Sequence, residues 1–475
     1  MTDQIHATRL EQDGLGEMAI SAGTYYGIQT QRALDNFQIS GISINHYPNL
    51  IRAFGMVKKA CAAANMKLGY LEAKKYRVIS QACDEMIAGS LHEWFTVDVF
   101  QGGAGTSTNM NVNEVISNRG LELLGFPMGK YQHLHPNDDV NLSQSTNDVY
   151  PTSVRLSILL SHPEMMRALD GLAGEFRKKG MEFADIIKLG RTQLQDAVPI
   201  TLGQEFDAFA VNIQEDISRG DEIVGLFREV NLGGTAVGTG INTAPEYSDL
   251  AIEELCRTSG LEMLRAANLI EASWDTGAFV LYSGMLKRIA VKLSKIANDL
   301  RLLSSGPRGG LNEIALPPMQ PGSSIMPGKV NPVIPEVVNQ VCFQVIGNDL
   351  AITMAAEAGQ LQLNVMEPLI VYNVLSSMQL LMRAANALAG KCVSGIQANA
   401  EQAMRHMEAS VGIVTALNPY IGYENSAWLA KEALRSGHTV RELCIEKQWL
   451  TQAQLDDILD VARLTAPRRK AGGIL

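Results

Sequence analysis

Two stretches in the middle of the sequence carry a sustained helical spacing of apolar and small residues. From Phe206 to Phe227 such residues recur at intervals that alternate between four and three, and a second run extends from Leu286 to Leu303. In the second run, lysines and an aspartate occupy the positions between the apolar ones. A repeat of this kind is typical of long helices that pack at a shallow angle. The pattern therefore predicts long amphipathic helices in the middle of the chain.

Two further stretches, 337–354 and 369–388, are apolar on nearly every side of the expected helix. A helix without a polar face has to be buried all round. So much apolar surface predicts a helical bundle that is larger than one chain can close. We therefore expect a mainly α-helical protein whose long central helices form a multi-helix core in a homo-oligomer.

The regions on either side of the expected bundle have a different character. Up to about residue 140, short helical patterns alternate with Gly, Pro and Asn, and after about Ala400 the patterns become shorter and more charged. We predict three domains: a mainly helical N-terminal domain over 1–147, a central long-helix bundle over 148–399, and a small C-terminal helical domain over 400–475.

The composition excludes some classes of protein and indicates the cellular compartment. Hydrophobic residues make up 46% of the chain and the net charge is −10, which is typical of a globular protein and argues against a nucleic-acid binder. The six cysteines are scattered without a C-x-x-C pair, which favours reduced thiols over disulfides or a zinc site. The polar N-terminus is unlike a signal peptide, and no apolar run reaches the roughly 20 residues needed to cross a bilayer. We expect a cytoplasmic protein that binds no membrane.

Four polar segments rich in small residues lie between the helical patterns. They are G-G-A-G-T-S-T-N at 102–109, S-Q-S-T-N-D at 143–148, G-R-T-Q-L-Q-D at 190–196, and G-S-S-I-M-P-G-K-V-N-P at 322–332. Hydroxyls, amides and the backbone N–H groups of helix N-termini are suited to binding carboxylates. Capping of a following helix is the simpler interpretation of each of the first three segments alone. Glycines flank the serines of the fourth segment, so we expect it to move as a lid.

The fourth segment resembles the signature of the fumarase/aspartase superfamily, and the other three match that superfamily in order and approximate spacing. The similarity runs over nearly the whole chain, from Tyr25–Tyr26–Gly27 to Leu417–Asn418–Pro419. It implies a three-domain, mainly helical fold in which the long helices of four subunits pack into one bundle. It also implies a homotetramer whose active sites are each shared by three subunits.

Two positions distinguish the branches of this superfamily. Gln193 follows Thr192 where fumarases typically have histidine, and Glu367 stands where fumarases usually have lysine. Both residues resemble the aspartase branch, which implies the reversible deamination of L-aspartate to fumarate and ammonia by a carbon–nitrogen lyase. A class II fumarase that interconverts fumarate and L-malate, and a non-catalytic scaffold of the same fold, stay open as alternatives.

The resemblance also implies roles for individual residues. Ser323 is the expected base, which removes the C3 proton as an alkoxide and leaves an aci-carboxylate. Its pKa has to be lowered, and backbone N–H groups near Ile325 and Met326 and the charge of Lys329 are candidates for this effect. The expected ligands are Thr106, Ser145, Thr146 and Ser324 for the β-carboxylate, Thr192, Lys329 and Asn331 for the α-carboxylate, and Asn147 with Thr106 and Gln193 for the ammonium group.

The resemblance implies no redox or organic cofactor and no catalytic metal. The segment His133–Asn141 matches the region where relatives have a second, non-catalytic carboxylate site, at or near which substrate and Mg²⁺ activate some of them. An ordinary polar loop is the stronger interpretation of this segment, and Mg²⁺ is retained as a candidate activator.

Overall fold

The structure is a computed structural model that describes residues 7–466. Residues 1–6, which belong to the polar N-terminus discussed above, and residues 467–475 of the predicted C-terminal domain lie outside this range. Most of the described chain is α-helical, and its short strands pair in twos, which confirms the predicted mainly α-helical class. Within the described range, no helix is long and apolar enough to cross a membrane.

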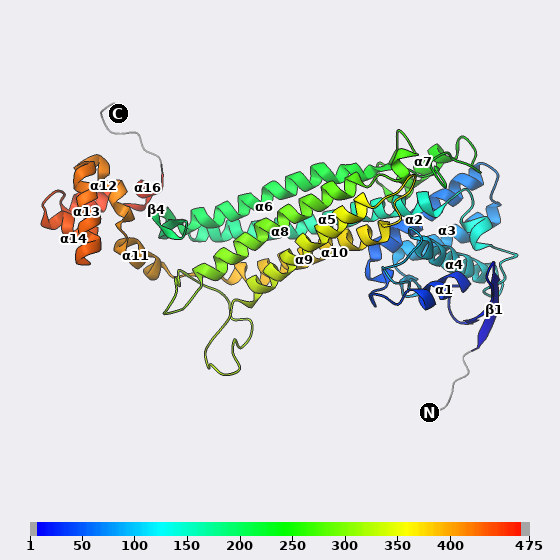
Figure 1. The fold of residues 1–475 in the computed structure, drawn as a ribbon, viewed down its shortest axis with the longest axis horizontal. Coiled ribbons are helices and arrows are strands. Elements are labelled where there is room, and N and C mark those ends of the chain that lie inside the picture. Colours follow the sequence, from blue (N-terminus) through cyan, green and yellow to red (C-terminus); the bar gives the residue numbers. More distant parts are fainter. Residues whose placement is uncertain (1–6, 467–475) are drawn as a thin grey trace. The chain divides into compact units, whose positions relative to one another are not determined.

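The elements are labelled as in Figure 1. The α-helices are α1 Ile28–Asn36, α2 Pro48–Lys67, α3 Ala73–Ala88, α4 Thr106–Leu123, α5 Thr146–Glu182, α6 Leu202–Val224, α7 Tyr247–Ser259, α8 Gly277–Leu303, α9 Val333–Glu357, α10 Glu367–Lys391, α11 Ala400–Ala409, α12 Val414–Ile421, α13 Tyr423–Ser436, α14 Val440–Glu446, α15 Gln452–Ile458 and α16 Val461–Leu464. The strands are β1 Thr8–Asp13, β2 Gly16–Ser21, β3 Ile187–Thr192, β4 Gln195–Thr201, β5 Glu229–Val230, β6 Leu264–Arg265, β7 Ile314–Ala315 and β8 Gln397–Ala398.

The chain folds into two compact units. The first unit comprises the residues up to Met166 together with Arg219–Arg288 and Gln344–Leu380. The second unit comprises Arg167–Ser218, Ile289–Phe343 and the residues from Leu381 onward. The long helices α5, α6, α8, α9 and α10 each contribute to both units. Because the units cut across these helices, they do not test the three predicted domain boundaries, which stay a prediction.

The periodic stretches form the long helices that the pattern predicts (Figure 1). Polar contacts add to the apolar packing between these helices. In the first unit, the Ser283 hydroxyl on α8 donates a hydrogen bond to Asp349 on α9 at 2.8 Å. In the second unit, the Asn339 amide on α9 donates to the hydroxyl of Ser294 on α8 at 2.9 Å. Such pairs satisfy polar groups that would otherwise be costly to bury.

Two helical regions differ from the expectation. The 37-residue helix α5 is not predicted by the pattern, because Pro151 and Pro163 lie inside it and proline normally ends a helix. The expectation of only short helices before residue 140 is also wrong, since α2 has 20 residues. Gly55 interrupts the pattern of α2, but an added Cβ at Gly55 would lie 3.1 Å from the Ile87 side chain. Glycine normally disfavours a helix, but here it allows α2 to pack closely against α3.

Helix α9 is not buried on every side within one chain. Val345 and Ile352 are buried, whereas Phe343, Leu350 and Met354 are 62%, 63% and 65% exposed. The three exposed side chains follow one another at intervals of seven and four residues, so they share a face of the helix. An apolar face of this kind is typical of a surface that another protein covers.

Candidate active site

The ten predicted site residues fall into two groups that belong to different units. The first unit holds Thr106, Ser145, Thr146 and Asn147, and the second unit holds Thr192, Gln193, Ser323, Ser324, Lys329 and Asn331. Each unit therefore carries part of a candidate site.

Ser145 and Thr146 form the N-terminal turn of α5. The Ser145 hydroxyl oxygen accepts a hydrogen bond from the backbone N–H of Asn147 at 3.2 Å, so the capping interpretation of this segment holds. The Thr146 hydroxyl oxygen accepts from the amide of Asn109 at 3.1 Å. These roles are compatible with ligand binding, because a hydroxyl that accepts a hydrogen bond keeps its own hydrogen to donate. The turn thus offers two hydroxyl donors at the positive end of a long helix dipole.

A cavity of about 550 Å³ lies beside this turn. Its lining includes Gln144, Ser145 and Thr146 from the segment at the start of α5, and Thr235 and Ala236 from a segment that follows β5. The Asn147 amide spans these two segments, since it donates to the Ala236 carbonyl oxygen at 2.8 Å. The lining is rich in hydroxyls and amides, which suits a small polar ligand rather than an apolar one.

Thr106 begins α4 and is exposed. Its hydroxyl donates to the Gly103 carbonyl oxygen at 2.7 Å, across the glycine-rich turn that precedes the helix. The preceding Gly105 has a φ of +88°, and a Cβ there would collide with the ring of Tyr150 on α5. This glycine is required for the N-terminal turn of α4 to pack against α5.

Two buried charged residues hydrogen-bond to the segments that carry the first group, and no pattern in the sequence predicts them. The Lys58 ammonium donates to the side-chain oxygens of Asn141 and Gln144 at 2.9 and 2.8 Å, and burial lowers its pKa to about 8. Burial raises the pKa of Asp148 to about 6, although Asp148 accepts a hydrogen bond from the Ser145 backbone N–H at 2.9 Å. The signal in the sequence is weak, since nothing local distinguishes Lys58 from the neighbouring Lys59.

Thr192 and Gln193 lie at the tip of the hairpin formed by β3 and β4. Thr192 pairs with Gln195, and the two residues between them, Gln193 and Leu194, have φ angles of +56° and +62°. Two consecutive left-handed residues occur in the tight turn type that suits a hairpin, but they strain residues other than glycine. Capping of a following helix is therefore the wrong interpretation of this third segment. Strain of this kind concentrates at functional sites.

The fourth segment arranges Ser323 as predicted. Its hydroxyl oxygen accepts hydrogen bonds from the backbone N–H groups of Ile325 at 3.2 Å and Met326 at 2.9 Å. Donors aimed at an oxygen favour its charged form over the neutral one. The same segment leaves Ser324 and Lys329 exposed.

The two ends of the fourth segment are clasped together. The Asn331 amide donates to the Gly322 carbonyl oxygen at 2.6 Å. A Cβ at Gly322 would collide with the carbonyl oxygen of Lys329, so the close approach requires glycine. The ring so formed holds Ser323 and Asn331 in one short loop, and movement of this loop as a lid stays a prediction.

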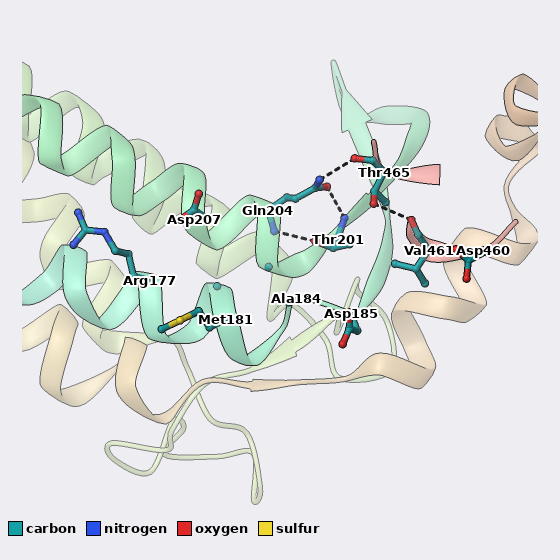
Figure 2. A pocket seen from close by; sticks show the side chains of 12 residues that line it. Arg177, Met181, Ala184, Asp185, Thr201, Gln204, Asp207, Asp460, Val461 and Thr465 are labelled. Carbon is teal, nitrogen blue, oxygen red and sulfur yellow. Dashed lines mark hydrogen bonds between the residues drawn. The ribbon is translucent and has the colours of Figure 1, made fainter. Parts of the chain in front are cut away.

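A separate hollow of about 780 Å³ lies in the second unit, and Figure 2 shows its lining. It contains none of the predicted site residues. Several of its polar groups already pair with one another: the Gln204 amide donates to the Thr465 carbonyl oxygen at 3.0 Å, and its side-chain oxygen accepts from the Thr201 backbone N–H at 3.0 Å. The hollow is therefore a weaker candidate than the four polar segments.

Comparisons with known proteins cover the whole candidate site. The family model described as "Lyase" matches residues 16–347, and the model described as "Fumarase C C-terminus" matches residues 413–466. An aspartate ammonia-lyase from Pseudomonas aeruginosa is 59% identical over 465 residues, which are 98% of each chain.

Two solved structures have closely similar folds. A fumarate lyase:delta crystallin from Brucella melitensis, bound to cobalt, has a TM-score of 0.95 and 62% identity, and the match covers 97% of this chain and 100% of that one. A class II fumarase from Schistosoma mansoni has a TM-score of 0.91 and 36% identity, with 98% and 100% covered. The chain therefore belongs to the aspartate ammonia-lyase family, within the fumarase/aspartase superfamily of lyases.

Proposed function

We propose that this protein catalyses the reversible deamination of L-aspartate to fumarate and ammonia. The observation that carries the proposal is the 59% identity, over nearly the whole chain, to a relative named aspartate ammonia-lyase. The class II fumarase is only 36% identical over a similar share of the chain. Gln193 and Glu367, at the two positions that distinguish the branches, support the same choice.

In the proposed mechanism, Ser323 acts as an alkoxide and takes the C3 proton of aspartate. The electron pair of the C–H bond moves into the β-carboxyl group and forms an aci-carboxylate. This pair then forms the C2–C3 double bond while the C–N bond breaks, so that the ammonium group leaves as ammonia. The hydrogen bonds from Ile325 and Met326 to the serine oxygen support this role, because they favour the alkoxide.

The charge that develops on the β-carboxyl group needs donors that are already in place. We assign this task to Thr106, Ser145, Thr146 and Ser324. The position of Ser145 and Thr146 at the N-terminus of α5 supports the assignment, since the helix dipole favours negative charge there. Thr192, Lys329 and Asn331 are proposed to bind the α-carboxylate, and Asn147 with Thr106 and Gln193 to receive the ammonium group.

We also propose a cytoplasmic homotetramer with active sites shared by three subunits. The exposed apolar face of α9, formed by Phe343, Leu350 and Met354, supports assembly through the long helices. The division of the predicted site residues between two units is compatible with sites completed by neighbouring subunits.

No organic cofactor enters the proposed reaction, and Mg²⁺ is a candidate activator only. The residues near His135 are a poor fit for a resident Mg²⁺. The Asp139 carboxylate already accepts from Lys75 at 2.7 Å and from the His135 backbone N–H at 2.7 Å. Activity measured with and without added Mg²⁺ after chelator treatment tests this activation.

A two-substrate assay tests the proposed reaction. The ultraviolet absorbance of fumarate is followed after addition of L-aspartate and, separately, of L-malate. We expect fumarate to form from L-aspartate alone. Turnover of L-malate alone would support the fumarase alternative, and absence of turnover with either substrate would support the non-catalytic scaffold.

A further inference from the structure

Glu313 is a fully buried carboxylate that contacts three basic side chains. Its side chain is 0% exposed. One carboxylate oxygen accepts from the Arg191 guanidinium at 2.8 Å and lies 2.9 Å from Nδ1 of His406, while the other lies 3.2 Å from the ammonium of Lys188. Burial raises the pKa of Glu313, but the Arg191 hydrogen bond and the Lys188 charge outweigh burial and lower its pKa overall. Glu313 is therefore a buried anion.

The partners of Glu313 come from separate segments of the second unit. Arg191 is on β3 and directly precedes Thr192, and His406 is on α11. The Glu313 backbone is held as well, since its N–H donates to the Leu303 carbonyl oxygen and its own carbonyl accepts from the Asn399 N–H. The chain then continues through β7, which pairs with β8, toward the loop that carries Lys329 and Asn331.

In the hairpin that carries Thr192, the regular pairing of the strands is interrupted next to Arg191. The strand register shifts between Leu189 and Arg191, which is a bulge at Gly190. A Cβ at Gly190 would lie 2.7 Å from the Val198 carbonyl oxygen, so the bulge depends on glycine. Because regular strand pairing is interrupted there, the ion pair between Arg191 and Glu313 supplies a restraint on the hairpin tip that strand pairing alone does not.

We propose that Glu313 is a positioning residue for the α-carboxylate of the substrate. The inference rests on the proposed function, which assigns this carboxylate to Thr192, Lys329 and Asn331. Thr192 is attached to Glu313 through Arg191, and Lys329 and Asn331 lie on the loop that follows Glu313 along the chain. The Glu313 carboxylate holds the first segment through Arg191, and the hydrogen bonds of the Glu313 backbone fix the point from which the chain leads to the second. Glu313 therefore affects the substrate only through these segments.

The test compares a ligand that has two carboxylates with one that has a single carboxylate. Succinate and propanoate are titrated calorimetrically into the full-length protein and into the variants Glu313→Gln and Arg191→Met. We expect succinate to bind about tenfold more weakly to each variant, which corresponds to about 1.4 kcal/mol. Propanoate should bind as before through the unchanged hydroxyls of the first unit. With L-aspartate, KM should rise about tenfold while kcat changes much less, as for lost uniform binding.

A matched control separates this role from a general loss of charge. Arg435 on α13 is 76% exposed and pairs with Glu432 at 2.6 Å, so Arg435→Met should alter neither ligand's affinity. Arg191→Met carries the test if Glu313→Gln does not fold, because Glu313 then keeps Lys188 and His406 as partners.

Two results would overturn the inference: an equal loss of succinate and propanoate binding, which is the mark of a merely structural role, and unchanged succinate binding in Arg191→Met. Failure of the proposed function is a distinct outcome. It would appear as the wrong substrate in the two-substrate assay, whereas the calorimetric comparison does not depend on turnover.

Discussion

The hydroxyl oxygen of Ser323 accepts a hydrogen bond from the backbone N–H of Met326 at 2.9 Å, three residues further along the same loop. The contact lies wholly within one segment, as does the clasp between Asn331 and Gly322. The serine is therefore arranged by its own loop, without help from a ligand. Preorganisation of this kind lowers the cost of forming a charged oxygen at the moment of reaction.

Replacement of the proposed base should abolish turnover without affecting the fold. We expect Ser323→Ala to lower kcat by at least about 10³-fold, within the range for loss of a general base. The melting temperature should not change, because the loop is exposed at its tip, with Ile325 83% exposed. Initial rates of fumarate formation and a thermal melt provide the measurements. Ser436→Ala, at the exposed end of α13, is the control. Turnover within about tenfold of the unchanged protein would contradict the role of Ser323.

The clasp at the base of the loop predicts a second variant with reduced activity. In Gly322→Ala, the added methyl group collides with the Lys329 carbonyl and displaces the loop. A displacement of about 1 Å can cost roughly 100-fold in rate, so we expect a loss of kcat/KM of that order. Gly309→Ala is the matched control, because a Cβ at Gly309 meets nothing within 4 Å. Equal activity of the two variants would show that the clasp is dispensable.

Asp98 should stabilise the protein at neutral pH and less in acid. Burial raises the pKa of Asp98. The hydrogen bonds from Ser40, Phe100 and Gly41 have the larger effect, so the pKa of Asp98 lies below the ordinary value of 3.8. Because the folded state binds the proton less readily than the unfolded state, this contribution is complete above pH 3.8 and is lost as the pH falls through the lower, folded-state pKa.

The variant Asp98→Asn tests this contribution. We expect it to lower the free energy of unfolding by about 1–3 kcal/mol at neutral pH, the cost of leaving buried donors without an acceptor. Urea unfolding at neutral pH and below the ordinary aspartate pKa provides the comparison. The difference between the two proteins should shrink in acid, and a difference that is independent of pH would be evidence against the assigned hydrogen bonds.

Glu367 should have the opposite dependence on pH. Burial raises its pKa from 4.5 to about 8, and the charge of Arg155 lowers it only in part. The folded state therefore binds more protons than the unfolded state between pH 4.5 and about 8, so this residue costs stability as the pH rises through that window. Glutamine does not titrate. The melting temperature of Glu367→Gln, relative to that of the unchanged protein, should therefore rise as the pH goes from 5 to 8. A constant difference across that range would rule out a raised pKa.

The exposed face of α9 predicts which substitution breaks the assembly. Leu350 is 63% exposed within one chain, and we expect Leu350→Glu to dissociate the proposed tetramer by placing a charge in its apolar contact. Light scattering after gel filtration measures the mass of the particle. Leu434→Glu, at a side chain of α13 that is 76% exposed, should leave the mass unchanged. If Leu350→Glu is still a tetramer, the exposed face of α9 does not lie in the subunit interface.

The sequence by itself determines the features whose cause lies within a few residues. Apolar repeats identify α6, α8, α9 and α10, because the face of a helix is set by spacing alone. The predicted donors to Ser323 are confirmed for the same reason, since they lie two and three residues away. Where local and long-range effects oppose each other, as at Pro151 and Pro163 in α5, the local signal misleads.

Only the tertiary structure decides which polar side chains are buried and paired across long stretches of sequence. Lys58 and Lys59 are neighbours in α2, yet Lys58 is buried against Asn141 and Gln144 while Lys59 pairs with Asp84. Glu313 meets Arg191 and His406, which are 122 and 93 residues away. Such pairs form because packed faces bring distant residues together and exclude water from between them, and no local pattern carries that information.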